Sequence, residues 1–328
     1  ALRQWAAALL GAHGLPQADA GLAAEVLAGA DLRGIGTHGV AQLPSYADWL
    51  RRGVTNARPD IRIARQGAVL AVDADRGLGQ VAVVRALDAA MDLATDAGVA
   101  IASISRSGHL GALGYYARRA CEAGMLAIAM QNGPPLMALP GMKRRAIGNN
   151  PIAFAAPVEG RPPLVFDMAA SEAAYGKVVA ASLAGEALPE GWALDADGEP
   201  TRDAQRALGG MLLPVAGAKG IGLAMMVECL AGSLGGTRPV WGEGLFGGFL
   251  MVMRPSAAIE PDAFAADVAA WLAHYAGSGP QARYPGERTA ALHAERSRTG
   301  VPLADGVAER LRATGAQAGV PFVEPPAT

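Results

Sequence analysis

The chain has 328 residues and a mass of 33.3 kDa, enough for one large or two medium domains with a sizeable core. Hydrophobic residues make up 51% and charged residues 18%, a composition typical of a folded globular protein and not of a disordered one. The net charge of −2, from 28 basic and 30 acidic residues, gives no electrostatic basis for binding nucleic acid or an anionic membrane. A small molecule is therefore the expected partner.

Cys121 and Cys229 are the only cysteines in the sequence, which excludes a disulfide framework and any four-cysteine metal site. No metal site is predicted, and the low cysteine content favours a reducing compartment, which predicts a cytoplasmic protein. The most apolar long segment covers residues 221–231 and contains Glu228. It is well short of the roughly 20 residues that a membrane-spanning helix needs, so no such helix is predicted.

The N-terminal third predicts helices first and a sheet afterwards. Apolar residues at helical spacing, bounded by glycine and proline, predict helices over residues 2–10 and 17–32. Alternation around Ile61 and Ile63, a Gln66-Gly67 turn and a second apolar run predict a hairpin over residues 61–72. A helical face that ends at Gly98 and a β-branched run over residues 99–105 come next.

Helices and strands alternate through the rest of the chain. Further helices are expected over residues 115–123, 173–183, 219–231 and 262–275, and further strands over residues 126–130, 152–156, 164–168 and 249–253. A turn-rich stretch covers residues 132–150. This interleaving predicts an α/β or α+β fold, with the helices of both chain ends in a separate layer and a boundary near residue 75.

One glycine pattern resembles a dinucleotide fingerprint but lies in the wrong context. Residues 34–39 read G-x-G-x-x-G, yet the preceding segment is helical in period, whereas the fingerprint follows a β-strand. The match is therefore interpreted as coincidental. The sequence also lacks a phosphate-binding P-loop motif, a G-x-S-x-G elbow and an H-E-x-x-H helix, so nucleotide hydrolysis, serine hydrolysis and zinc proteolysis lose support.

Two of the five histidines, His38 and His109, lie in glycine-rich loops directly after regular elements. Imidazole titrates near neutral pH, and loops on a rigid scaffold often carry catalytic groups, so both are candidates for acid–base chemistry. The alternative is that each caps a neighbouring backbone group. The other three histidines are interpreted as structural.

A second candidate feature is the helix start at residues 217–222, Gly-Ala-Lys-Gly-Ile-Gly. A glycine-rich helix N-terminus beside Lys219 suits a phosphate or pyrophosphate, although tight helix packing explains the glycines equally well. Residues 285–287, Pro-Gly-Glu, predict a tight turn with an anchored carboxylate.

Taken together, six segments carry a resemblance to a known family: residues 30–40, 148–153, 167–171, 188–195, 212–224 and 285–287. In this combination the chain resembles the malate/L-lactate dehydrogenase family of the non-Rossmann type. That family also includes ureidoglycolate, sulfolactate and diketogulonate dehydrogenases and the cyclic-imine carboxylate reductases. The resemblance covers nearly the whole chain.

The resemblance implies an α/β architecture of two domains. A helical domain would be formed by residues 1–75 with the C-terminal helices of about residues 255–328, and a cofactor domain around a mixed sheet by residues 76–254. It also implies a homodimer and an NAD(P)-dependent oxidoreductase that uses NADH or NADPH without the glycine fingerprint.

The same resemblance implies roles for individual residues. His38 and His109 would be catalytic, and Thr37, Gln42 and Asn149 would bind substrate. The residues expected to line the cofactor are Asn132, Asp167, Met168, Ala169, Ser171, Lys219, Pro285, Gly286 and Glu287.

Three substrate-site positions depart from the family pattern. Thr37 replaces the usual serine and keeps the hydroxyl, Asn149 replaces a threonine, and Gln42 replaces an arginine. Arginine would hold a substrate carboxylate through two charge-assisted hydrogen bonds, which glutamine cannot make. The resulting hypothesis is a reductase that delivers hydride to C2 of a cyclic 2-imino acid or a 2-oxo acid, or oxidises a 2-hydroxy acid in reverse. The alternative is a cofactor-binding homologue with lost or strongly altered turnover.

Overall fold

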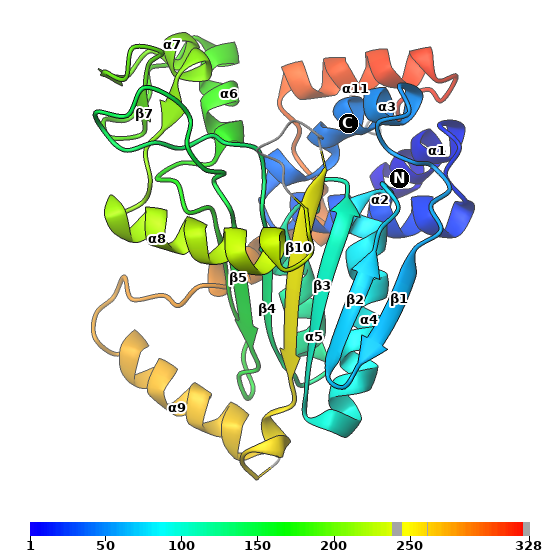
Figure 1. Ribbon diagram of the computed structural model, residues 1–328, viewed down its shortest axis with the longest axis vertical. Helices are drawn as coiled ribbons and strands as arrows, with labels where there is room; N and C mark the ends of the chain where they lie inside the picture. The colour runs from blue at the N-terminus through cyan, green and yellow to red at the C-terminus, as the bar shows by residue number, and fades with distance from the viewer. Residues whose placement is uncertain (238–244, 261, 324–328) are drawn as a thin grey trace.

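A mixed seven-stranded sheet forms the centre of the protein in a computed structural model that describes residues 1–237, 245–260 and 262–323 (Figure 1). The strand order is β1-β2-β3-β10-β4-β5-β6. Among these strands β2 and β3 run parallel, and the other neighbours pair antiparallel. A three-stranded sheet of order β8-β7-β9 lies apart from it. The predicted mixed α/β class is confirmed.

The strands are β1 (Arg62–Gln66), β2 (Val69–Asp73), β3 (Val99–Ser107), β4 (Leu126–Gln131), β5 (Ile152–Ala156), β6 (Leu164–Met168), β7 (Ala193–Leu194), β8 (Pro200–Thr201), β9 (Met211–Leu212) and β10 (Phe246–Met253). The α-helices are α1 (Leu2–Ala12), α2 (Gln17–Leu32), α3 (Leu43–Arg51), α4 (Gly79–Ala97), α5 (Leu113–Glu122), α6 (Tyr175–Ala184), α7 (Ala204–Gly209), α8 (Ala218–Val227), α9 (Ala263–Ala276), α10 (Glu287–Thr299) and α11 (Asp305–Gln317).

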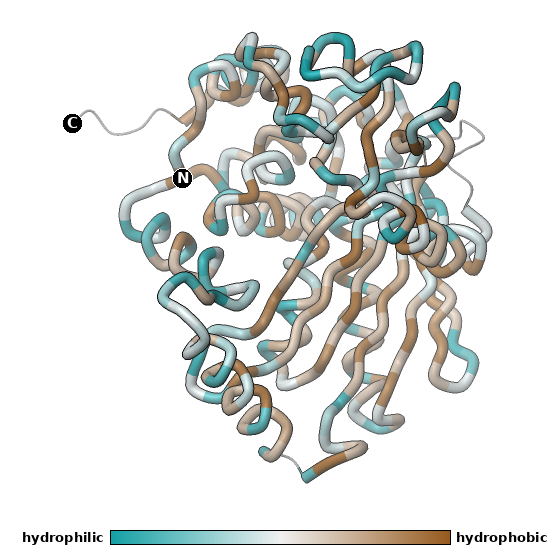
Figure 2. The backbone as a smooth tube through the Cα atoms, turned by 90° about the vertical axis from the view of Figure 1, so that its left-hand side faces the viewer, coloured by the Kyte–Doolittle hydropathy of each residue, from teal (hydrophilic) through white to brown (hydrophobic). Residues whose placement is uncertain are grey.

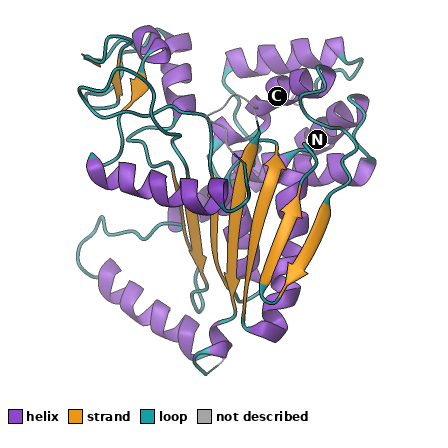
Figure 3. Ribbon diagram, viewed as in Figure 1, coloured by secondary structure: helices purple, strands orange, loops and turns teal. Residues whose placement is uncertain are grey.

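Helices cover both faces of the large sheet (Figure 3). The apolar faces of α4 and α5 pack against the middle strands and form the largest core cluster with them, while α8 crosses the opposite face (Figure 1). The central strands appear largely brown in Figure 2 because their residues are mostly hydrophobic, as expected where helices cover both faces of a sheet. The sheet therefore provides a rigid platform, with functional loops at the ends of its strands.

Helices from the two ends of the chain pack together. Trp5 on α1 is 3% exposed, its ring meets that of Phe322 edge to face, and its Nε1 donates to the carbonyl of Val320 (3.1 Å). Leu311 of α11 is fully buried in the same cluster as the apolar residues of α1, α2 and α3. Contacts between residues more than 300 positions apart therefore join α1 to the segment that follows α11.

The other C-terminal helices lie elsewhere. On α9, Val268 and Leu272 pack with Val158 and Tyr284, and α10 lies against α2, where Arg296 donates to the carbonyl of Asp31. The division into two domains near residue 75 stays a prediction. The pairing of β2 with β3 crosses that position.

Most predicted elements are confirmed, and the differences have local causes. Two predicted strands coincide with β5 and β6. The helix expected over residues 115–123 begins at Leu113, because the Asp167 carboxylate accepts a hydrogen bond from the Gly114 amide and stabilises an earlier first turn. The strand expected over residues 249–253 begins at Phe246, and the helix expected over residues 219–231 changes at Glu228 to a π-helical turn.

Candidate active site

The two loop histidines lie together although 71 positions separate them. His38 follows α2, His109 follows β3, and their ring centroids are 5.7 Å apart in a stacked arrangement. Burial lowers the pKa of His38, and burial together with the nearby His38 lowers the pKa of His109 to about 3. Two adjacent imidazolium charges would repel each other, so at most one of the two imidazoles is protonated to the cation near pH 7.

The loop that carries His38 is held by a buried carboxylate on α2. Asp31 is 2% exposed, and its Oδ2 accepts from the Val40 amide (2.8 Å). The backbone of Gly39 passes so close that an added Cβ would lie 1.9 Å from Oδ1 of Asp31. Burial raises the pKa of Asp31 to about 7. Residues 34–39 therefore form a helix-to-3₁₀ loop with α2 and no strand before it, which confirms that the glycine match is coincidental.

His109 is enclosed by residues from three other elements. The Tyr46 hydroxyl of α3 lies 2.8 Å from Nδ1 of His109, and Nε2 of Gln80 on α4 donates to that hydroxyl (3.0 Å). Phe246 of β10 meets the imidazole edge-on at 5.6 Å between centroids. Tyr46 and Gln80 are fully buried, whereas His109 is partly buried. The ring is thus fixed by several contacts, and part of the residue remains exposed.

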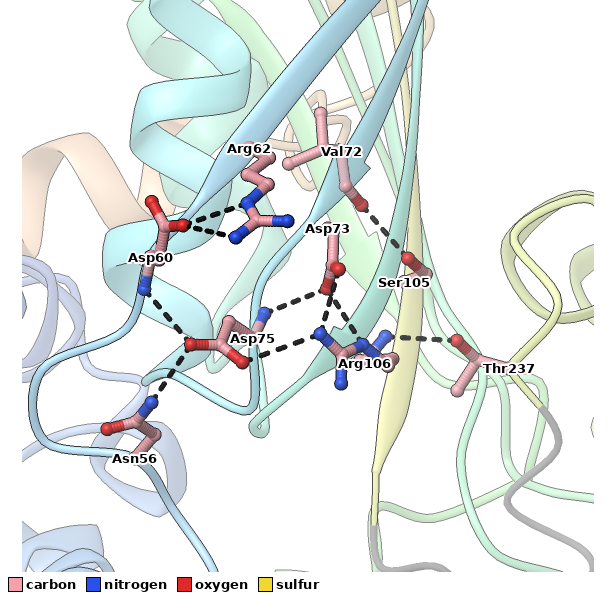
Figure 4. A network of polar contacts seen from close by, with 9 residues as sticks. All are labelled: Asn56, Asp60, Arg62, Val72, Asp73, Asp75, Ser105, Arg106 and Thr237. Atoms are coloured by element: carbon pink, nitrogen blue, oxygen red, sulfur yellow. Dashed lines mark hydrogen bonds and ion pairs between the residues drawn. The ribbon is translucent and has the colours of Figure 1, made fainter.

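A polar network fixes the backbone just before His109 (Figure 4). Arg106, at the end of β3, makes two hydrogen bonds to the Asp73 carboxylate (2.8 and 2.9 Å) and one to Asp75 (3.4 Å). Its amide donates to Oγ1 of Thr237 (3.1 Å). Arg106 and Asp75 both have positive φ angles, which non-glycine residues adopt only when their surroundings enforce them. The network therefore directs the chain sharply from β3 into the His109 loop.

Two of the three predicted substrate residues, Thr37 and Gln42, contact His38 or its loop. Oγ1 of Thr37 lies 3.0 Å from Nδ1 of His38. The Gln42 side chain points back onto the loop, where its Nε2 donates to the carbonyl of Thr37 (2.6 Å). Gly176 on α6 approaches Thr37 so closely that an added Cβ would lie 3.1 Å from the Thr37 Cβ. Asn149 is joined through its carbonyl to the amide of Ala170 (2.8 Å).

Four of the nine predicted cofactor residues lie at the end of β6 and in the segment after it, and contacts bring others beside them. Asp167 and Met168 end β6, and the Val165 amide in the same strand donates to the carbonyl of Pro285 (2.9 Å). The Ala170 carbonyl accepts from the Val215 amide, which brings the start of α8 and its Lys219 beside this segment. Glu287 closes its turn as expected, since its Oε2 accepts from the Tyr284 amide (3.2 Å).

Three of the predicted cofactor side chains are already bonded within the protein. Asn132 bonds to Glu228, to the Thr237 carbonyl and to the Gly247 amide. Asp167 caps α5, and the Ser171 hydroxyl donates to the carbonyl of Ala173 (2.7 Å). These residues would therefore shape a cofactor site through the backbone that they hold in place.

The start of α8 has the donor chemistry that a pyrophosphate requires. Lys219 is exposed on the first turn of this ten-residue helix, where the helix dipole and the cation favour the same negative charge. A cavity of about 350 Å³ reaches the same loop at Gly217, but Glu172 and Glu190 in its wall would repel phosphate. A phosphate is therefore expected on the Lys219 side of the loop and outside that cavity.

The histidine environment also contains residues that sequence reasoning missed: Asp31, Tyr46, Gln80 and Phe246. Gln80 and Asp31 are polar residues within apolar helical stretches, and that pattern could have marked them. Nothing local in the sequence marks Tyr46 or Phe246. No group of three or more His, Cys, Asp or Glu side chains that could hold a metal ion occurs among the described residues, and no helix in that part of the chain is long and apolar enough to cross a membrane.

Comparisons with known proteins find similar sequences that cover most of this chain. The model of the malate/L-lactate dehydrogenase family matches residues 1–312. The (2R)-3-sulfolactate dehydrogenase (NADP(+)) of Chromohalobacter salexigens is 41% identical over 232 residues, covering 71% of this chain and 70% of that protein. The ureidoglycolate dehydrogenase (NAD(+)) of Escherichia coli is 42% identical over 224 residues, covering 67% of this chain and 63% of that protein.

A solved structure extends the similarity to the whole fold. The Δ1-piperideine-2-carboxylate reductase of Pseudomonas syringae pvar. tomato superposes with a TM-score of 0.88 at 33% identity, covering 95% of this chain and 97% of that one. The predicted fold of this chain, a mixed sheet without the classical dinucleotide fingerprint, is thereby confirmed.

Proposed function

We propose that this protein, which belongs to the malate/L-lactate dehydrogenase family, reduces a cyclic 2-imino acid in preference to a simple 2-oxo acid. It is an NAD(P)-dependent oxidoreductase of 2-hydroxy and 2-oxo acids, and its cofactor is NAD(H) or NADP(H). The observation that carries the proposal is the stacked His38–His109 pair, beside which Gln42 replaces the expected arginine.

The reaction divides between the cofactor and the histidine pair. The nicotinamide, when bound, supplies the hydride to C2 of the substrate. In a 2-oxo acid the electron pair of the opening C=O bond goes to the oxygen atom, which takes a proton from His38. In a cyclic imine the nitrogen atom takes that proton first, and hydride addition to the protonated C=N bond then leaves a neutral amine. Burial lowers the pKa of His38, but the carboxylate of a bound substrate would raise it again, because a nearby opposite charge favours the imidazolium. His38 can then carry the proton that the reduction consumes.

The environment of Gln42 supports the choice of substrate. The Gln42 side-chain amide already donates a hydrogen bond to the Thr37 carbonyl, and glutamine carries no charge. A second substrate carboxylate would therefore be desolvated here without a cationic partner. A protonated cyclic imine brings its own positive charge, which partly neutralises the adjacent carboxylate. The site therefore suits an imino acid better than an oxo dicarboxylate.

Replacing Gln42 with arginine should shift specificity toward dicarboxylates. A charge-assisted hydrogen bond contributes about 1.5–3 kcal/mol, which is roughly a 10- to 100-fold change in relative kcat/KM. The measurement is kcat/KM of wild type and Gln42→Arg on Δ1-piperideine-2-carboxylate and on a 2-oxo dicarboxylate, with the same cofactor at saturation. We expect the ratio of oxo dicarboxylate to imino acid to rise by at least about tenfold.

Gln42→Lys is the matched control, since lysine adds the charge without the planar fork, and its gain should be smaller. A wild-type enzyme that already prefers the dicarboxylate would contradict the interpretation of Gln42. A wild type that binds NAD(P)H and turns over neither substrate class would instead favour the homologue with lost turnover.

Lys219→Ala should raise the KM for the cofactor and leave the KM for the substrate nearly unchanged. The reason is that Lys219 is exposed at the N-terminus of α8, beside the predicted cofactor segment. Steady-state kinetics with each reactant varied in turn measure both constants. Lys177→Ala is the control, because this exposed lysine lies over the Trp192 ring on another helix. An equal rise in both constants would support the packing explanation of the α8 glycines.

We also propose that the protein is a cytoplasmic homodimer. Met225 and Met226 on α8 and Leu234 just beyond its π-helical continuation are exposed, and a second copy of the chain could cover them.

Cys121 and Cys229 are both unpaired, as expected in a reducing compartment. The remaining predicted site residues, from Thr37 to Glu287, are proposed in the roles that the family resemblance implies.

A further inference from the structure

We propose that Gln80 is a positioning residue that acts through Tyr46 to fix the proton of neutral His109 on Nε2. His109 would then donate a hydrogen bond to the reacting oxygen atom of a 2-oxo acid, or to the lone pair that develops on the nitrogen of a protonated imine as hydride adds, while His38 supplies the proton. This inference deepens the proposed function and rests on it for the identity of the reaction. The assignment of the tautomer rests on the side-chain contacts alone.

A buried chain of hydrogen bonds links Gln80, Tyr46 and His109. Nε2 of Gln80 donates to the Tyr46 hydroxyl oxygen at 3.0 Å, and this oxygen lies 2.8 Å from Nδ1 of His109. A hydroxyl has one proton. Since Gln80 occupies an acceptor position of the Tyr46 oxygen, the Tyr46 proton is free to be donated to Nδ1. Nδ1 is then the acceptor, and the single proton of the neutral imidazole resides on Nε2.

The reverse orientation of the chain is less favourable. If the Gln80 amide were turned over, Tyr46 would donate to its carbonyl oxygen, and His109 would carry its proton on Nδ1. That arrangement would break the hydrogen bond that the buried NH₂ group of Gln80 donates to the Tyr46 oxygen. The observed orientation keeps this donor paired and leaves the Oε1 acceptor without a partner. Buried donors without partners are rarer in proteins than carbonyl oxygens without partners, so the chain runs from Gln80 to His109.

The surroundings of His109 keep the imidazole neutral, as this role requires. Tyr46 and Gln80 are fully buried uncharged groups, Phe246 covers a ring edge, and His38 stacks on the face. Burial also raises the pKa of Tyr46 well above its usual value, so Tyr46 remains a hydroxyl and not a phenolate. A neutral imidazole can polarise a C=O or C=N bond through its N–H without losing the proton. Donors aimed at developing charge are a large contribution in many enzymes.

The test measures the tautomer directly, without cofactor or substrate. The protein is labelled with ¹⁵N at histidine, and long-range ¹H–¹⁵N correlation spectra distinguish the protonated from the unprotonated ring nitrogen. We expect wild-type His109 to carry its proton on Nε2. In Gln80→Glu, studied at a pH above the burial-raised pKa of the new carboxyl group, the ionised side chain only accepts, so Tyr46 would donate to it and His109 would have to donate to Tyr46. The His109 proton should therefore move to Nδ1, and kcat should fall by about 10²- to 10³-fold, as for loss of one donor to the transition state.

Gln131→Glu is the matched control. Gln131 Oε1 accepts from the amide of Leu110 (2.7 Å), so the change places a carboxylate beside the same loop and keeps the acceptor. The His109 tautomer should stay on Nε2 there. Tyr46→Phe gives a second variant, in which Nδ1 loses its partner and both tautomers should become populated.

Three outcomes would overturn the inference. The first is a wild-type proton on Nδ1. The second is an unchanged tautomer in folded Gln80→Glu together with an unchanged tautomer in Tyr46→Phe. The third is a reversed tautomer with unaltered kcat on a substrate that the wild type reduces. Failure of the proposed function would look different, since the wild type would then reduce no 2-imino or 2-oxo acid while its spectra still reported the tautomer.

Discussion

Replacing His38 with alanine should lower kcat by about 10²- to 10⁴-fold and leave the affinity for NAD(P)H nearly intact. A positioned acid contributes this much because it delivers the proton as the double bond opens. His38 is suited to the role because it is partly buried, lies beside the Thr37 hydroxyl and stacks on a histidine that stays neutral. The measurements are kcat at saturating substrate and the fluorescence titration of NADH and NADPH.

Two further histidine variants make this result specific. His274 is exposed on α9, so His274→Ala should leave kcat unchanged and control for the loss of an imidazole as such. His109→Ala should be less severe than His38→Ala, because it removes a hydrogen-bond donor and not the proton source. If His109→Ala were crippling while His38→Ala kept nearly normal kcat, the proton donor would be His109, and His38 would be only a substrate contact.

Replacing Gly39 with alanine should impair both stability and catalysis. The new methyl group would meet the Asp31 carboxylate at 1.9 Å, and Asp31 could move only by giving up its bond to the Val40 amide. Crowding a packed site and leaving a buried amide unpaired each cost about 1–3 kcal/mol, so we expect unfolding free energy to fall by at least about 1 kcal/mol. The neighbouring His38 should shift with the loop, and a misplacement of about 1 Å can reduce the rate by roughly 10²-fold.

Gly36→Ala is the control on the same loop. Its added methyl group would meet Asp31 only at 3.8 Å, an ordinary contact, so both stability and kcat should stay near wild type. Urea unfolding and kcat are measured for both variants and for Gly39→Ala combined with Asp31→Ala. If the clash is the cause, the double variant will lose less stability than the sum of its two single changes. Additive losses would place the cause in the Gly39 backbone and not in Asp31.

The elements that could be predicted from sequence are those with a strong periodic pattern or a clear end signal. Strands β5 and β6 are short apolar runs between turns, and α2 lies between Pro16 and Gly34. Helix α10 could not be found this way, because none of its residues is buried and its sequence has no apolar face. The position of β10 between β3 and β4 depends on pairing between distant segments, about which local pattern carries no information.

The candidate site divides in the same manner. His38 and His109 could be selected because each stands in a glycine-rich loop, but their stacking depends on how α2 and β3 meet in the fold. The contact between Tyr46 and His109 joins residues 63 positions apart, and Gln80 is fully buried although it is polar. Spacing cannot reveal such contacts, because they arise from tertiary packing. The direction of the hydrogen bonds around His109 depends on its buried partners, which the local sequence does not identify.

The contact between Trp5 and Val320 has a consequence for the order of folding during synthesis. Helix α1 leaves the ribosome before its partners Leu311, Val320 and Phe322 exist, since Val320 follows Trp5 by 315 positions. At about 5–20 residues per second, the apolar face of α1 remains uncovered by these partners for roughly 15–60 s. The large sheet needs only residues 62–253, so it can form within that interval. The packing of α1 is completed only when the C-terminal residues have been made. Nascent chains of this protein should therefore bind holdase chaperones through their N-terminal helices until residue 322 has emerged.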